Sequence, residues 1–180
     1  MSRVANLEAA GCTSGGKEMA RDKTPMTPAV RALRQAGVAI TEHPYRYVEH
    51  GGTATFAREF GVDEHAVIKT LVMEDDAKRP LVVLMHGDRE VSTKELARTL
   101  GVKAVQPCAP ETAERHSGYM VGGTSPFGMR KALPIYMEQT ILELPRIYIN
   151  GGKRGFLVGL DPKDLTRMLK PTPVRVAIVG

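Results

Sequence analysis

The sequence predicts a single domain of the α/β (α+β) class, in which helices and strands alternate around a mixed β-sheet. Short β-branched runs alternate along the chain with segments that begin at helix-capping residues. Some neighbouring runs are separated by hairpin-length turns and others by a helical segment, which predicts both antiparallel and parallel pairing. The length of 180 residues and the apolar content of 42% suffice for one sizeable core. We find no internal repeat and no second domain.

The helices are predicted from their first and last residues. Thr27, followed by Pro28 at the first helical position, begins a helix that runs to Gly37. The segment Ser-Thr-Lys-Glu at 92–95 is a capping box that opens a helix ending near Gly101. The same kinds of signal predict further helices at 53–60, 110–115 and 161–170.

The strands are predicted from apolar and β-branched runs. The runs at 67–73 and 80–86 form a hairpin across a charged turn. The segment Asn-Gly-Gly at 150–152 is predicted to begin a tight turn. The remaining extended segments are expected at 38–47, 102–106, 133–137, 146–150, 155–160 and 174–179.

Lys69 is the most informative residue of the predicted strand at 67–73. Its neighbours on the same face, Val67, Leu71 and Met73, are apolar. Burying an ammonium among such residues without a partner is costly, and proteins tolerate the cost where the charge binds an anion or a polarised oxygen. The alternative is that the lysine stem lies along the strand and the ammonium reaches water. The strand alone favours neither interpretation.

A glycine-rich loop at 118–128 is a second candidate. It holds four glycines and one proline in eleven residues, so it cannot form a helix or a regular central strand. The N–H groups of such a loop can approach a ligand oxygen closely, as in an anion-binding nest or an oxyanion hole. It is neither a P-loop nor a dinucleotide fingerprint, because the residues and spacing that define those motifs are missing. The alternative is an ordinary turn.

Three segments together resemble the signatures of the YbaK/EbsC family of free-standing aminoacyl-tRNA deacylases, which is similar to the editing domain inserted in bacterial prolyl-tRNA synthetase. They are Val-Ile-Lys-Thr-Leu at 67–71, Gly-Tyr-Met-Val-Gly-Gly-Thr-Ser-Pro-Phe-Gly at 118–128 and Gly-Gly-Lys-Arg-Gly at 151–155. The resemblance begins at Met-Thr-Pro-Ala-Val and covers 26–180. It implies a strongly curved, barrel-like mixed sheet flanked by helices. Residues 1–25 would then be an N-terminal extension, which we expect to be poorly ordered.

The resemblance also implies roles for individual residues. Lys69 matches a lysine that faces the bound aminoacyl-adenosine end, and Gly122 lies in an element whose backbone contacts the aminoacyl group and the terminal ribose. We therefore expect Lys69 and Gly122 to be catalytic. Tyr45 matches a pocket tyrosine, although a half-buried strand aromatic is the commoner situation. The expected substrate-binding residues are Tyr45, Gly123, Thr124, Ser125, Pro126, Asn150 and Gly151.

The amino-acid specificity is left open by two departures from the family pattern. Asn150 stands where cysteinyl-specific members often carry Ser. Leu157 stands where those members often carry an acidic residue, so that carboxylate is missing here.

The net charge of +5 and the isoelectric point near 9.3 suit a partner that bears phosphates. Two basic pairs flank the expected site, Arg130-Lys131 and Lys153-Arg154. For either pair alone a solvated turn is the simpler interpretation. Because both pairs lie around one expected pocket, we predict that these four residues contact the tRNA backbone.

Several function classes are disfavoured by what the sequence lacks. Its two cysteines, Cys12 and Cys108, and its five scattered histidines show no metal-ligand spacing, so neither a metal nor a cofactor is expected. No Gly-x-Ser-x-Gly elbow is present. No run approaches the roughly 20 apolar residues of a membrane span, and residues 1–25 do not read as a secretory signal. We expect a reduced, cytoplasmic compartment and no membrane partner.

The function expected from these observations is trans-editing of mischarged tRNA, with Cys-tRNA(Pro) as the first candidate substrate and prolyl-tRNA synthetase as a candidate partner. An aminoacyl ester is already reactive, so a protein that positions it and polarises its carbonyl needs no catalytic triad. In the cysteinyl case the family is thought to use the thiol of the substrate itself as nucleophile, and for alanine a water would attack. The alternatives are a deacylase for another small amino acid such as Ala, a non-catalytic tRNA-binding module and a small-molecule esterase.

Overall fold

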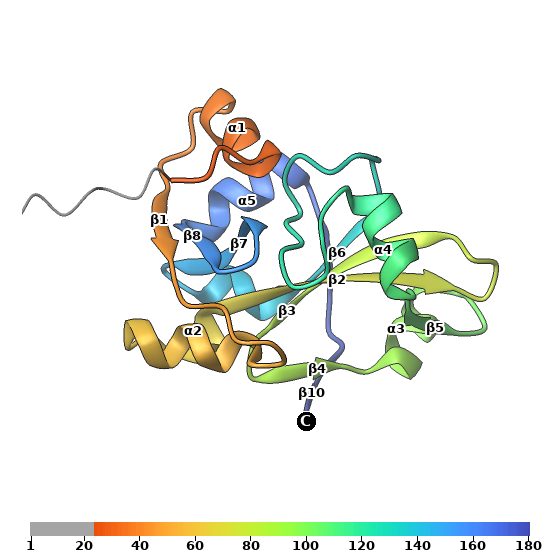
Figure 1. Ribbon diagram of the computed structural model, residues 1–180. Helices are drawn as coiled ribbons and strands as arrows, with labels where there is room; N and C mark the ends of the chain where they lie inside the picture. Colours follow the sequence, from red (N-terminus) through yellow and green to blue (C-terminus); the bar gives the residue numbers. More distant parts are fainter. Residues whose placement is uncertain (1–23) are drawn as a thin grey trace, which may run out of the picture.

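The structure is a computed structural model that describes residues 24–180 (Figure 1). The predicted N-terminal extension, with Cys12, therefore lies almost entirely outside the described residues and stays a prediction. In the described part, helices and strands alternate along the chain as expected.

One eight-stranded mixed sheet organises the domain. Its strands follow the order β1-β8-β7-β2-β3-β6-β9, with β5 beside β2. The pairs β2–β7, β3–β6 and β6–β9 are parallel and the others antiparallel, which confirms the predicted mixed sheet. The strands are β1 Thr41–Pro44, β2 Val67–Asp75, β3 Pro80–His86, β5 Val105–Pro107, β6 Ile135–Glu138, β7 Ile147–Lys153, β8 Phe156–Leu160 and β9 Thr172–Val174. A second, two-stranded sheet joins β4 (Arg89–Val91) and β10 (Ala177–Val179).

The helices begin where their capping residues predicted. The side chains of Thr27, Ser92 and Asp161 accept hydrogen bonds from the first turn of the helix that follows each of them. The capping box is half formed, because the Glu95 carboxylate pairs with Arg98. The helices are α1 Pro28–Gln35, α2 Gly52–Phe60, α3 Thr93–Leu100, α4 Pro110–Ser117 and α5 Pro162–Leu169, with 3-10 turns η1 Glu64–Ala66 and η2 Gln139–Glu143.

The predicted C-terminal strand at 174–179 is wrong, because the chain there forms two short strands in different sheets. The reason is the buried Glu138 carboxylate, whose Oε2 accepts hydrogen bonds from the N–H groups of Val176 (2.8 Å) and Ala177 (2.9 Å). In a continuous strand, these two N–H groups would be available to pair with a neighbouring strand.

The predicted tight turn at 150–152 is also wrong. Strand β7 continues to Lys153 through an irregularity in its pairing with β8 between Asn150 and Lys153. The Asn150 side chain supports this bulge, because its Oδ1 accepts from the N–H groups of Gly152 (2.7 Å) and Lys153 (3.2 Å). A bulge bends the strand and changes the direction of its side chains, and bulges are common beside functional sites.

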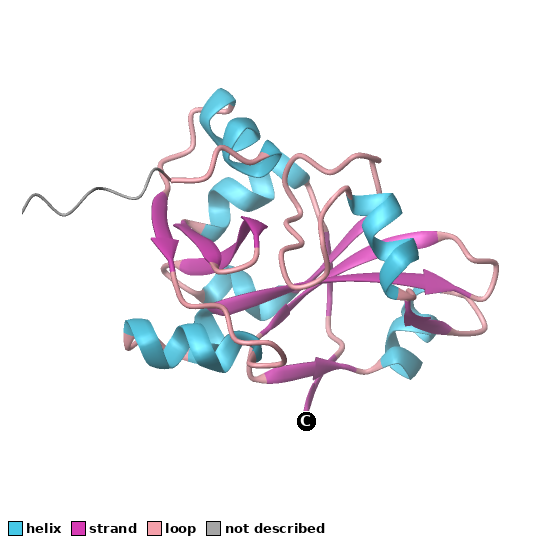
Figure 2. Cartoon of the chain, in the orientation of Figure 1, coloured by secondary structure: helices cyan, strands magenta, loops and turns pink. Residues whose placement is uncertain are grey.

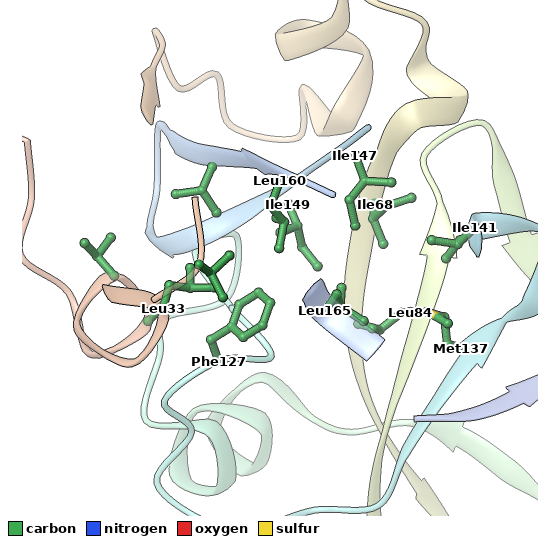
Figure 3. Close-up of a cluster of buried hydrophobic side chains, with 14 of the residues drawn as sticks. Leu33, Ile68, Leu84, Phe127, Met137, Ile141, Ile147, Ile149, Leu160 and Leu165 are labelled. Carbon is green, nitrogen blue, oxygen red and sulfur yellow. The ribbon is translucent and has the colours of Figure 1, made fainter. Parts of the chain in front are cut away.

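Hydrophobic clusters cover both faces of the sheet. The α1 cluster lies under α1 and α5 and includes Leu33, Ile149 and Leu165 (Figure 3). The α3 cluster lies on the opposite face, since alternate residues of β3 belong to it: Val82 and Leu84 face α1, whereas Val83 and Met85 face α3. A smaller α2 cluster consists of Phe56, Ala57, Val67 and Leu157.

The middle of β2 is left with one free edge. On that side β2 pairs with β7 only at Val67 and Ile68, and with β5 only from Met73 onward. Within the described part of the chain, the residues between, 69–72, have no strand partner on that side. The glycine-rich loop is part of the long irregular segment between α4 and β6 (Figure 2). It is this unpaired stretch of β2 that forms a wall of the candidate site.

Candidate functional site

A cavity of about 530 Å³ opens beside the free edge of β2. Its other walls come from the loop between β1 and α2, the start of α4, the glycine-rich loop and the β7–β8 hairpin. A volume of this size is typical of small-ligand sites, which span roughly 300–1,000 Å³. Residues far apart in the sequence therefore meet at one hollow.

The cavity brings together several residues that the sequence singled out. Six of them line it: Tyr45, Lys69, Gly122, Thr124, Asn150 and Arg154. The three resembling segments thus converge on one place in the fold. Whether each residue has its expected role stays a prediction.

Other expected substrate-binding residues lie behind the cavity wall. Ser125 is fully buried, and its hydroxyl accepts a hydrogen bond from the N–H of Phe127 (3.3 Å). Gly123 packs closely on the β7–β8 hairpin, since a Cβ there would lie 2.8 Å from the nitrogen of Arg154. Gly151 lies within β7, where a Cβ would lie 2.5 Å from the Phe156 ring. Pro126 is buried too. These residues support the loop that carries Gly122.

Lys69 lies between two hydrophobic clusters. On its face of β2, Val67 packs in the α2 cluster, whereas Leu71 and Met73 pack in or against the α3 cluster. The lysine therefore occupies the gap between the two helices. Its ammonium donates a hydrogen bond to the main-chain carbonyl of Arg89.

The surroundings of Lys69 shift its pKa in opposite directions. Burial lowers the pKa of Lys69, while the carboxylates of Glu90, Glu64 and Asp88 oppose that shift. Among residues 24–180, no carboxylate lies within ion-pair distance of its ammonium. The positive charge is thus available to a ligand in the cavity.

Gly122 has a backbone conformation that favours glycine, with φ at 88°. A Cβ there would lie 2.9 Å from Tyr47 Oη and 3.3 Å from Arg154 Nε. The Gly122 carbonyl accepts a hydrogen bond from Asn150 Nδ2 (3.1 Å). The hairpin and the glycine-rich loop are therefore fixed to each other at the cavity.

The expected tRNA-contacting residues separate into two groups. Lys153 and Arg154 are exposed on the β7–β8 hairpin beside the cavity. Arg130 and Lys131 do not line it, and Lys131 Nζ lies 3.2 Å from Nδ1 of His116 in α4. The pairs thus do not form one continuous rim, and their contact with tRNA stays a prediction.

Among the cavity residues that were not predicted as site residues, Tyr47, Thr70 and Cys108 have informative surroundings. Tyr47 lies under the Arg154 guanidinium, whose central carbon is 5.3 Å from the ring centre. The Thr70 hydroxyl is buried and has no hydrogen-bond partner among the described residues. The Cys108 thiol lies 3.8 Å from Glu74 Oε2, and burial together with that carboxylate raises the pKa of Cys108 to about 11. At neutral pH it is a thiol, so it is a poor nucleophile.

Residues 24–180 contain no group of three His, Cys, Asp or Glu side chains arranged to hold a metal ion. No helix in the same part of the chain is long and apolar enough to cross a membrane.

Comparison with known proteins places this site in a family. A sequence model of the family described as "Aminoacyl-tRNA editing domain" matches residues 50–168. The chain is 32% identical over 149 residues to an Enterococcus faecalis protein described provisionally as the Cys-tRNA(Pro)/Cys-tRNA(Cys) deacylase EbsC, covering 82% of this chain and 91% of that protein. It is 30% identical over 104 residues to a proline–tRNA ligase of Nitratidesulfovibrio vulgaris, covering 58% of this chain and 16% of the ligase.

Solved structures share the fold. The hypothetical protein APE2540 matches with a TM-score of 0.77 and 20% identity, covering 84% of this chain and 100% of that chain. A protein described provisionally as a trans-editing enzyme for prolyl tRNA synthetase matches with a TM-score of 0.73 and 21% identity, covering 86% and 99%. With the family match over most of the domain, these findings show that the chain belongs to the aminoacyl-tRNA editing domain family, whose members act on the ester bond of aminoacyl-tRNA.

Proposed function

We propose that this protein is a deacylase that edits mischarged tRNA in trans, with Cys-tRNA(Pro) as the first candidate substrate. The observation that carries the proposal is the meeting of Lys69 and Gly122 at one cavity of about 530 Å³. A cation and a glycine-rich backbone are the two kinds of group that stabilise the developing oxyanion of an ester. The E. faecalis relative is described provisionally as acting on cysteinyl-tRNA, which supports the choice of substrate.

Besides an oxyanion site, an aminoacyl ester requires acceptors for its α-ammonium. The free edge of β2 carries backbone groups that can serve as such acceptors. The Val72 carbonyl accepts a hydrogen bond from the Cys108 N–H at this edge. Backbone groups alternate between the two edges of a strand, so the Thr70 N–H and carbonyl face the same edge. The Thr70 carbonyl at this edge is a suitable acceptor for the α-ammonium of the substrate.

The wall that would contact the amino-acid side chain is largely apolar. Leu71, Val72 and Leu157 all line the cavity, and Leu157 replaces the carboxylate expected in cysteinyl-specific relatives. Such a wall accepts a small thiol or methyl side chain and disfavours a charged one. Size selection in an apolar pocket yields only about 1–3 kcal/mol per methylene, so Cys and Ala must be compared directly.

A deacylation panel tests the proposal. Cys-, Ser-, Ala- and Pro-tRNA(Pro) would be compared at equal concentration, with wild-type protein and Lys69→Ala. We expect the fastest release from Cys-tRNA(Pro) and a slow reaction with the seryl ester, because the hydroxyl is a weaker nucleophile than the thiol. Faster release of Ala would identify a water-dependent alanyl deacylase. No release from any substrate would overturn the deacylase proposal.

A further inference from the structure

The glycine-rich loop is held by two side chains of the β7–β8 hairpin that bind successive carbonyl groups. Arg154 Nε donates to the Val121 carbonyl (2.8 Å), and Asn150 Nδ2 donates to the Gly122 carbonyl (3.1 Å). Within the loop, the Gly123 N–H donates to the Met120 carbonyl (2.8 Å). The peptide planes on both sides of Gly122 are therefore fixed.

The bond from Arg154 also sets the direction of the Gly122 N–H. The N–H and C=O of a trans peptide point in opposite directions, and the Val121 carbonyl points toward Arg154. The Gly122 N–H consequently points away from Arg154. Among the described residues it has no acceptor, and Gly122 lines the cavity. The neighbouring N–H groups do have acceptors, since the Val121 N–H donates to Glu114 Oε1 (3.1 Å) and the Gly123 N–H to the Met120 carbonyl.

Arg154 is itself held by Tyr47. The guanidinium lies 5.3 Å from the ring centre, a distance suited to a cation–π contact. The Tyr47 segment is in turn fixed to the hairpin, because the Tyr45 N–H donates to the Gly155 carbonyl (2.8 Å). Both side chains pack on the Cα of Gly122, where a Cβ would lie 2.9 Å from Tyr47 Oη. We call this arrangement of Tyr47, Arg154 and the Val121 carbonyl the arginine latch.

We propose that Arg154 is a positioning residue for deacylation: its Nε holds the Val121 carbonyl so that the Gly122 N–H is presented to the ester carbonyl of the substrate. This inference rests on the proposed function. It differs from the tRNA-backbone role that charge alone suggests for Arg154, because the latch uses the geometry of the guanidinium as well as its charge. Lysine carries the same charge but has neither an Nε–H at that position nor a planar group to stack on Tyr47.

The decisive variant is Arg154→Lys, which keeps the charge and removes the latch. Its matched control is Arg167→Lys, the same change at an exposed arginine that pairs with Asp164 on α5, outside the cavity. We expect Arg154→Lys to lower kcat on the best substrate by on the order of 10- to 100-fold, the scale of a misplaced reacting group. KM and the salt dependence of tRNA binding should change less than about twofold, because the charge stays. Arg167→Lys should match the wild type throughout.

Two further measurements separate positioning from scaffolding. Methylguanidinium at millimolar concentration should restore part of the kcat of Arg154→Ala and none of that of Arg154→Lys, in which the lysine stem fills the site. Tyr47→Leu should lower kcat as well, and the double variant Tyr47→Leu/Arg154→Lys should be no slower than the slower single variant, since both break one latch.

The outcomes are distinct. Wild-type kcat in Arg154→Lys, or a fall in melting temperature with unchanged turnover per folded molecule, would overturn the inference. If the wild-type protein deacylates no substrate, the proposed function fails, and the latch is judged alone by hydrogen exchange of the Gly123 amide, which donates to the Met120 carbonyl. Faster exchange in Arg154→Lys than in Arg167→Lys would support the latch, and equal exchange would overturn it.

Discussion

The ammonium of Lys69 in β2 donates a hydrogen bond to the main-chain carbonyl of Arg89 in β4. A carbonyl orients the ammonium without neutralising it, whereas a carboxylate would pair with its charge. Lysine has three N–H donors, so this bond leaves two for a ligand. The Arg89 carbonyl thus orients the Lys69 side chain, and the positive charge of the ammonium can still act on an oxygen in the cavity.

Replacing Lys69 by Ala should lower the deacylation rate by about 10²-fold, the usual effect of removing one electrostatic contact at a reacting centre. The protein should stay folded, because Lys69 forms no ion pair among the described residues and its removal leaves no buried carboxylate unpaired. Single-turnover rates and circular dichroism on one preparation check both points. Lys163→Ala, at an exposed position of α5, is the control. A folded Lys69→Ala protein with the wild-type rate would remove the central claim.

Binding to tRNA should weaken steeply with salt, because contacts between basic side chains and phosphates release counterions. Lys153→Ala, beside the cavity, should reduce the slope of log Kd against log salt by about one. The same change at Lys131 tests whether the contact surface extends past α4, since Lys131 lies next to His116 and away from the cavity wall. A salt-independent affinity, or equal activity on a free aminoacyl ester and on tRNA, would favour the esterase alternative.

The parts of the fold with local signals could be predicted from the sequence. Thr27 caps α1 through a neighbour three residues away, and the Lys69 strand is a single β-branched run. The break between β9 and β10 could not be predicted, because it depends on Glu138, 38 residues before its Val176 partner. Likewise the charge of Arg154 was visible in the sequence, but its bond to the Val121 carbonyl joins residues 33 apart. Contacts of this kind exist only once the sheet has formed.

Stability should fall in mild acid because of His86. This residue is fully buried, its Nδ1 lies 2.6 Å from the His65 carbonyl, and its Nε2 lies 2.7 Å from the Thr140 hydroxyl. Burial lowers the pKa of His86, opposed by its bond to the His65 carbonyl. As the pH falls below the unfolded pKa near 6.5, the unfolded chain takes up a proton before the folded one. The free energy of unfolding therefore decreases until the pH reaches the folded pKa. Urea unfolding between pH 7.5 and 5 should show a shallower decrease in His86→Gln than in the wild type, and equal decreases would contradict the assignment.

Gly122 should be intolerant of any side chain, and its replacement should reduce activity more than stability. Gly122→Ala places a Cβ 2.9 Å from Tyr47 Oη and 3.3 Å from Arg154 Nε, which are ends of side chains that can shift, so the latch moves and the loop survives. The positive φ of 88° adds roughly 1–2 kcal/mol of backbone strain. Gly101→Ala isolates that strain, because Gly101 has φ at 70° and, beyond its chain neighbours, no described residue lies within 4 Å of its Cβ position. The two variants should therefore melt at similar temperatures, while only Gly122→Ala loses turnover, with larger aminoacyl groups affected first. Melting temperature and deacylation rate measured on the same preparation distinguish the possibilities. If Gly122→Ala melts well below Gly101→Ala and its turnover per folded molecule is unchanged, the loop is scaffolding and the reacting centre lies elsewhere.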